Sequence, residues 1–157
     1  MNKNMYELDV TDMRIAVLMG GPGSERPVSM ASGAGVSKAL TSCGAIVTEV
    51  DVRDADFILP DGVELAFNVI HGTFGEDGQV QGILEQRGVR YTGEGVLQSQ
   101  IAIDKIATKR RLRERGVPTA DFEVIGVGDV PQLELPFVLK APKEGSSVGI
   151  YIQRKDL

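Results

Sequence analysis

Two glycine-rich loops carry side chains that could bind a small charged molecule. The first, residues 20–29 (GGPGSERPVS), contains the carboxylate of Glu25, and the second, residues 71–78 (HGTFGEDG), begins with His71, the single histidine of the chain. A carboxylate held by a glycine loop at a strand end can bind a substrate ammonium group. A polar turn at the same sheet edge can line the same pocket. The two loops therefore predict one shared ligand site.

Each of these residues also has an ordinary structural interpretation. Glu25 could be an acid in the first turn of a helix, where the helix dipole stabilises it. A lone histidine is more often structural than catalytic. Glu76 and Asp77 precede a helix that is expected to start near Gln79, and capping that helix is their more common role. Taken one at a time, the residues leave both interpretations open.

A third loop, residues 140–149 (KAPKEGSSVG), offers groups that suit a phosphate. It is no Walker A loop, because no lysine follows Gly149 and the segment joins two expected strands. A glycine–serine turn still presents backbone N–H and hydroxyl donors to phosphate oxygens, and Lys140 adds a positive charge. A plain hairpin turn remains the alternative.

The first loop also partly matches a dinucleotide-binding fingerprint. Gly21 and Gly23 supply the first two glycines of G-x-G-x-x-G, and Asp51 stands where an acid would bind a ribose. The third position is Arg26, where the fingerprint requires a glycine for close helix–strand packing. Two complete large domains are not expected to fit in these 157 residues either, so a dinucleotide-dependent oxidoreductase is disfavoured.

The elements that must position these loops follow from hydrophobic periodicity and turn residues. We expect an α/β fold, a doubly wound parallel sheet, because strands alternate with helices. Ligands of such sheets bind at the carboxyl ends of strands, which here places the site after Met19 and Ile70. The expected strands are Arg14–Met19, Ala45–Val52, Glu64–Ile70 and Val89–Thr92, and the expected helices are Val28–Leu40 and Gln79–Arg87.

A change of character after Ile103 predicts a second, smaller unit. A charged helix, Asp104–Arg115, ends at Gly116, and three short strands are expected at Phe122–Val127, Pro136–Lys140 and Ser147–Gln153. The predicted organisation is an N-terminal extension (1–13), a first domain (14–103) and an incomplete lobe (104–157). A lobe of this size has a small core and usually needs a partner to be stable.

Composition narrows the possible partners and the location. The net charge of -5 argues against a nucleic acid or an anionic membrane as the main partner. No apolar run approaches the roughly 18 residues that span a bilayer, and the polar start does not resemble a signal peptide. We therefore expect a cytoplasmic protein. Cys43, the only cysteine, lies in an apolar-periodic stretch and is expected to be a buried thiol.

Four segments of the chain carry a resemblance when they are taken together: GGPGSERPVS, HGTFGEDGQVQGILE, YTGEGVLQSQIAIDK and LPFVLKAPKEGSSVGI. In order and spacing they are similar to D-alanine–D-alanine ligases. The resemblance extends over nearly all of Arg14 to Gln153 and implies a Rossmann-like pre-ATP-grasp domain followed by the opening lobe of an ATP-grasp domain. One departure is Pro27, which stands where the family usually has an acidic residue.

The resemblance implies a role for particular residues. Glu25 corresponds to the carboxylate that binds and orients the first D-alanine, Ser146 to a hydroxyl in its hydrogen-bonded catalytic set, and His71 to a residue lining that pocket. Contacts to ATP are implied for Lys105 and Lys140. Phosphate contacts in a closing loop are implied for Gly145, Ser146 and Ser147.

The resemblance also implies a reaction. The carboxylate of one D-alanine attacks the γ-phosphate of ATP, and the amine of a second D-alanine attacks the resulting acyl phosphate, with Mg²⁺ assisting phosphoryl transfer. The Mg²⁺-binding acids belong to a C-terminal part that these 157 residues do not include. We therefore expect no ligation by this chain alone, and a homodimer is possible.

The alternative is a non-catalytic truncated relative, acting as a small-molecule-binding or interaction module. The sequence does not distinguish D-alanine from D-lactate or D-serine as the second substrate.

Overall fold

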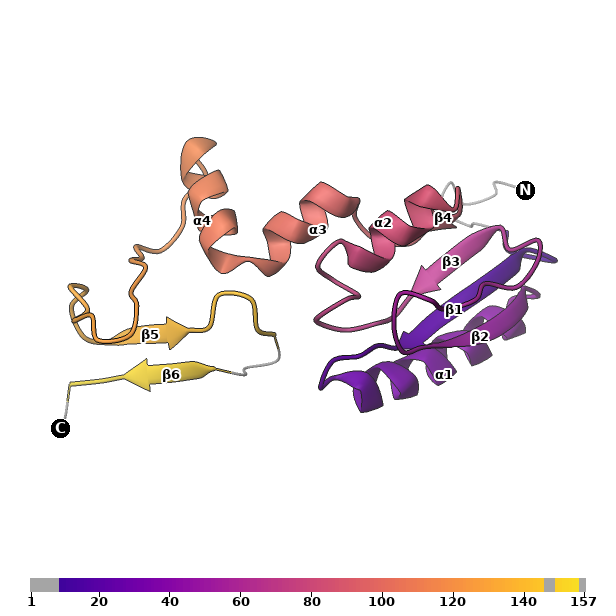
Figure 1. Cartoon of the computed structure of the whole chain (residues 1–157), viewed down its shortest axis with the longest axis horizontal. Helices are drawn as coiled ribbons and strands as arrows, with labels where there is room; N and C mark the ends of the chain where they lie inside the picture. The colour runs from indigo at the N-terminus through magenta and orange to yellow at the C-terminus, as the bar shows by residue number, and fades with distance from the viewer. Residues whose placement is uncertain (1–8, 146–148, 156–157) are drawn as a thin grey trace, which may run out of the picture. The chain divides into compact units, whose positions relative to one another are not determined.

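The computed structural model describes residues 9–145 and 149–155. The chain forms two compact units, residues 1–99 and 100–157 (Figure 1). The division falls inside a helix, α3 (Val96–Ile103), whereas the sequence analysis expected it after Ile103. None of the helices in the described ranges is long and apolar enough to cross a membrane.

The first unit is built on a four-stranded, wholly parallel sheet. Its strands are β1 (Arg14–Gly20), β2 (Ile46–Val52), β3 (Leu65–Asn68) and β4 (Arg90–Tyr91), in the order β2-β1-β3-β4. β1 lies between β2 and β3, which explains why its sequence is a continuous apolar run instead of an alternating one. The predicted α/β fold with a parallel sheet is confirmed.

Helices cover both faces of this sheet. Ile15, Val17 and Met19 of β1 pack with residues of α1 (Arg26–Ser42) on one face. Ala16 and Leu18 point to the other face and pack with residues of α2 (Gln79–Gln86). This alternation follows from the two-residue repeat of a strand, and it makes the unit doubly wound.

α1 packs on the sheet through small side chains. Its buried residues are Ser29, Gly33 and Ser37, spaced four apart along one face of the helix. A Cβ atom at Gly33 would lie 2.6 Å from the Cβ of Met19, so only glycine allows this approach. The glycine for close helix–strand packing, absent at position 26, is therefore supplied at position 33.

Ser29 joins the ends of the two strands that precede the candidate loops. Its hydroxyl accepts a hydrogen bond from the backbone N–H of Gly20 (2.9 Å) and donates one to the carbonyl of Val69 (2.7 Å). The residue is fully buried. Because a buried backbone group without a partner is costly, this one hydroxyl stabilises both strand ends at once.

The second unit contains α4 (Lys105–Glu114) and an antiparallel pair, β5 (Phe137–Lys140) and β6 (Ile150–Gln153). Asp104 caps α4 by accepting hydrogen bonds from the N–H groups of Ile106 and Ala107. The bond from Ala107, followed by that from Ile106, lowers the pKa of the Asp104 carboxyl. Every fully buried apolar side chain in the described ranges belongs to the first unit, so this lobe has only a thin core.

Two sequence expectations are wrong, and one helix was not predicted. Residues 122–127 form no strand. The N–H of Gly126 donates to the side chain of Asp129, and the carboxylate of Glu123 accepts from the N–H groups of residues 132 and 133, so the segment makes local loop contacts. Cys43 is exposed, because α1 ends at Ser42 and carries its apolar face no further over the sheet. Helix α3 has weak amphipathic periodicity, and the sequence analysis assigned no element to it.

Replacing Ser29 with alanine should destabilise the first unit strongly. The change leaves the Gly20 N–H and the Val69 carbonyl without their partner, at a cost of about 1–3 kcal/mol in the free energy of unfolding. Ser42→Ala is the matched control, because the Ser42 hydroxyl also donates to a carbonyl of α1 (Ala39, 2.7 Å) but is exposed. Urea unfolding followed by circular dichroism measures both. Equal losses for the two variants would contradict the role assigned to Ser29.

The second unit should open more readily than the first, because it buries so little apolar surface. Limited proteolysis of the native chain should therefore cut first beyond Asp104 and leave residues 14–103 intact. Mass spectrometry of the early fragments identifies the cut. First cuts within 14–103, or equal protection of both units, would show that the lobe is as stable as the sheet.

Candidate functional site

The ends of β1 and β3 bring the first two loops into contact. A Cβ atom at Gly21 would lie 2.6 Å from Ile70, and one at Gly23 would lie 3.9 Å from Thr73. Gly21 adopts a φ of +89°, which side chains rarely allow, so the loop can run this close only with glycine there. The sequence expectation that the two loops open at one sheet edge agrees with this geometry.

Glu25 points from the first loop to the second. It occupies the N-cap position of α1, but its side chain makes no capping hydrogen bond to the helix. A carboxylate oxygen of Glu25 lies against Gly72 instead, so closely that a Cβ at position 72 would collide with it. Helix capping therefore does not account for the carboxylate, which faces the loop that follows β3.

His71 lies beside this contact and is half-buried. Its Nε2 is 3.4 Å from the hydroxyl of Ser32 on α1, and its Nδ1 is 3.8 Å from a carboxylate oxygen of Glu76. The ring thus lies between the helix that follows the first loop and an acid of the second loop. Glu25 and His71, which the sequence analysis assigned to one pocket, flank Gly72 in the structure.

Residues that the sequence analysis did not single out hold the second loop in shape. Asn68 and Gln81 both donate amide hydrogen bonds to the carbonyl of Gly75, at 2.9 and 2.8 Å. Gln81 is buried on α2. The signal in the sequence is its position, next to Val80 and three residues before Leu84, on the apolar face of the helix. Gly75 is packed so tightly on the Ile70 carbonyl that a Cβ could not fit.

Asp77 stabilises both the second loop and the start of α2. It accepts hydrogen bonds from the N–H groups of Phe74 (2.9 Å) and Gln79 (3.1 Å). This agrees with the capping role expected for Asp77. Glu76, for which the same role was expected, has its carboxylate near His71.

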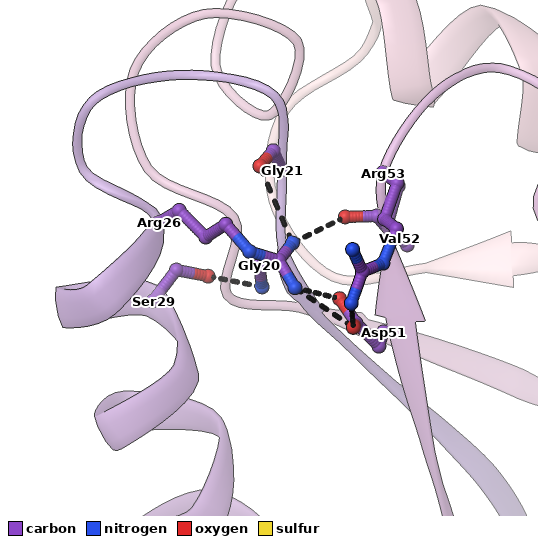
Figure 2. A network of polar contacts seen from close by, with 7 residues as sticks. All are labelled: Gly20, Gly21, Arg26, Ser29, Asp51, Val52 and Arg53. Atoms are coloured by element: carbon purple, nitrogen blue, oxygen red, sulfur yellow. Dashed lines mark hydrogen bonds and ion pairs between the residues drawn. The ribbon is translucent and has the colours of Figure 1, made fainter.

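A polar network holds the first loop to the end of β2 (Figure 2). The Nη2 atom of Arg26 lies 2.6 and 2.7 Å from the two carboxylate oxygens of Asp51, and Nη1 donates to the carbonyl of Val52 at 3.1 Å. Arg53 also reaches Asp51, at 3.1 Å. The acid that a dinucleotide site would use for its ribose is thus bound by two arginines, a second physical reason against an oxidoreductase.

In the second unit, Lys105 holds the third loop. Its Nζ donates to the carbonyl of Glu144 at 2.6 Å, and its backbone N–H donates to the carbonyl of Pro142 at 2.9 Å. The ammonium of Lys143 is 3.8 Å from Asp104, the residue before Lys105. The start of α4 and the loop before Gly145 are therefore joined by two neighbouring residues.

The remaining predicted site residues belong to the end of β5 and to the third loop. Lys140 is exposed at the end of β5, and Gly145 is half-buried. Ser146 and Ser147 lie outside the described residues. Within residues 9–145 and 149–155, no three acidic, histidine or cysteine side chains form a group that would hold a metal ion.

A cleft of about 190 Å³ lies at the amino ends of the strands, between Arg14, Ile46 and Pro60. It is at the opposite end of the sheet from Glu25 and His71. The convergence of two loops, and not the presence of a cleft, therefore identifies the candidate site.

Comparison with known proteins finds similarity to one group of enzymes, the D-alanine–D-alanine ligases. The family model described as "D-ala D-ala ligase N-terminus" matches residues 54–94. A D-alanine–D-alanine ligase of Desulforudis audaxviator is 49% identical over 152 residues, which cover 91% of this chain and 50% of that protein. One of Syntrophotalea carbinolica is 46% identical over 155 residues, which cover 94% of this chain and 50% of that protein.

Solved structures give the same result. The D-alanine–D-alanine ligase of Bacillus anthracis superimposes with a TM-score of 0.78 at 33% identity, over 92% of this chain and 50% of that one. The chain spans about half the length of the relatives it matches. By sequence and by fold, over about nine-tenths of its length, the chain is similar to the N-terminal half of D-alanine–D-alanine ligases.

Proposed function

We propose that this chain provides the pocket for the first D-alanine in an ATP-dependent D-alanine–D-alanine ligase. The observation that carries the proposal is the contact of the Glu25 carboxylate with Gly72, beside His71. D-Alanine is small and zwitterionic, so its ammonium group needs an anionic partner at a fixed place. Glu25 provides that anion on the rim of a rigid sheet.

The surroundings of Glu25 favour an amino acid over a larger ligand. Gly21, Gly23 and Gly72 keep the space between the loops narrow, because a side chain at Gly21 or Gly72 would strike the opposite loop. The half-buried ring of His71 lies next to Ser32 of α1, on one side of this space. A carboxylate in such a partly enclosed place attracts an ammonium group more strongly than one in open water does.

The second unit suits the nucleotide of the same reaction. Lys105 and Lys140 provide cations, and Gly145 with Ser146 and Ser147 would provide donors to phosphate oxygens. Because Lys105 binds carbonyls on the Pro142–Glu144 side of the loop, it also sets where that loop begins. Mg²⁺ would neutralise phosphate charge in this reaction, and the described residues of this chain offer no cluster of ligands for it.

The setting of the reaction belongs to the same proposal. A dipeptide of D-alanine is a precursor for bacterial peptidoglycan, which places the activity in the cytoplasm, where ATP is available. A homodimer remains part of this expectation.

Replacing Glu25 with glutamine should weaken D-alanine binding by about one to two orders of magnitude. The change keeps size and hydrogen bonding but removes the charge, and a charge-assisted hydrogen bond contributes about 1.5–3 kcal/mol. The measurement is a D-alanine titration of the ¹⁵N-labelled chain, followed at the backbone amide of Gly72.

Glu49→Gln is the matched control, because it removes one exposed acid from β2, away from the loops. L-Alanine is the control ligand. Binding that is unchanged in Glu25→Gln, or equally weakened in Glu49→Gln, would show that Glu25 does not bind the ammonium group.

A further inference from the structure

The side chain of Arg26 reaches away from the pocket and is held at three points. It binds both carboxylate oxygens of Asp51, donates to the carbonyl of Val52, and lies 3.5 Å from the carbonyl of Gly21 (Figure 2). These partners belong to the end of β2 and to the loop that follows β1. A planar guanidinium suits such an arrangement, because it directs several N–H groups at fixed angles.

The pair is better anchored than an ordinary surface ion pair. The side chain of Arg26 is 29% exposed and that of Asp51 is 36% exposed, so water screens them only in part. The hydrogen bond from Arg26 lowers the pKa of the Asp51 carboxyl below its ordinary value. Asp51 therefore stays ionised, and the pair stays formed, throughout the neutral range.

Arg26 and Glu25 are adjacent residues whose side chains point to different strand ends. Arg26 is the first residue of α1 and is tied to β2, whereas Glu25 is the N-cap residue and its carboxylate lies against Gly72 after β3. Anchoring Arg26 leaves the preceding peptide unit little freedom to rotate. The direction of the Glu25 carboxylate is thus coupled to the Arg26–Asp51 pair.

The path of the chain before Arg26 adds to this coupling. Gly20 and Gly21 both have φ near +90°, and a Cβ at Gly20 would lie 2.5 Å from Nη1 of Arg26 and 2.8 Å from Asp51. The guanidinium is therefore packed directly on the glycine turn that starts the loop. Ser29 secures the other end of the same helical turn through Gly20 and Val69.

We propose that Arg26, held by Asp51 and the Val52 carbonyl, is a positioning residue that aims the Glu25 carboxylate into the pocket between the first and second loops. The inference rests on the proposed role of Glu25 in binding the ammonium of D-alanine. Arg26 itself does not touch the ligand; it acts through the residue beside it. Asp51 is its partner in this role.

The chain offers a matched control for the test. Arg53 also binds Asp51, at 3.1 Å, but it lies just beyond β2 and its side chain is 74% exposed. Among the described residues, no hydrogen bond or ion pair joins its side chain to the first loop. Arg26→Gln and Arg53→Gln each remove one positive charge that contacts the Asp51 carboxylate. A purely electrostatic effect on the ligand would be similar for both, whereas positioning depends on Arg26 alone.

In the D-alanine titration, Arg26→Gln and Asp51→Asn should each weaken binding about fivefold to tenfold, because small displacements of a binding group are costly. The double variant should be no weaker than the worse single one, since both remove the same link. Arg53→Gln should bind within about twofold of the unchanged chain. Arg26→Lys, which keeps the charge but not the fork of donors, should recover binding only in part.

Two readouts work without ligand. In Arg26→Gln the Gly72 amide signal should shift as the carboxylate moves, and in Arg53→Gln it should stay. The ¹³C-detected pKa of Asp51 should rise toward the ordinary value in Arg26→Gln. Because a lowered folded pKa adds stability above the unfolded pKa, that variant should lose stability near neutrality but not at a pH below the folded pKa.

The outcomes separate the two proposals. Unchanged D-alanine binding and an unchanged Gly72 signal in a folded Arg26→Gln would overturn the positioning role, while a loss in Glu25→Gln would still support the pocket. Equal losses in Arg26→Gln and Arg53→Gln would also overturn it. If the unsubstituted chain does not bind D-alanine, the proposed function fails. The shift of the Gly72 amide signal in Arg26→Gln without ligand then still decides whether Arg26 positions Glu25.

Discussion

A buried serine hydroxyl at the start of α1 is the contact on which the arrangement of the first unit depends. Ser29 bridges the N–H of Gly20 and the carbonyl of Val69, so the ends of β1 and β3 cannot separate without exposing or orphaning both groups. Both candidate loops leave the sheet at these points. Arg26, one turn earlier on α1, joins the helix start to the end of β2 through its ion pair with Asp51. One helical turn thus connects three strand ends.

The glycines of the first unit serve packing as much as they serve turns. Gly33 lets α1 approach Met19, and Gly75 lets the second loop lie on the Ile70 carbonyl. A dinucleotide-binding fold needs the packing glycine near the start of the helix, where this chain has Arg26. Here the packing glycine lies further along α1, which frees the first turn for an arginine and allows it to bind Asp51.

The two units differ in how their polar contacts are supported. In the first, the Glu25–Gly72 contact rests on a sheet whose central strand is buried on both faces. In the second, Lys105 holds its loop by hydrogen bonds to the carbonyls of Pro142 and Glu144, with little apolar burial beneath. The first two loops are therefore held by a well-packed sheet, whereas the third loop relies on exposed polar contacts.

Periodicity and turn residues in the sequence were sufficient to predict the parallel sheet, both of its covering helices and the edge where Glu25 and His71 lie, because burial on a sheet imposes a local pattern. The direction of the Glu25 carboxylate was decided only by tertiary structure, since capping and pocket roles require the same residue type. The same holds for residues 122–127, whose strand-like pattern gives way to a loop with local hydrogen bonds, from the Gly126 N–H to Asp129 and from residues 132 and 133 to Glu123. It also holds for Ser29, Arg26 and Asp51, because hydrogen bonds between residues far apart in sequence leave no periodic signal.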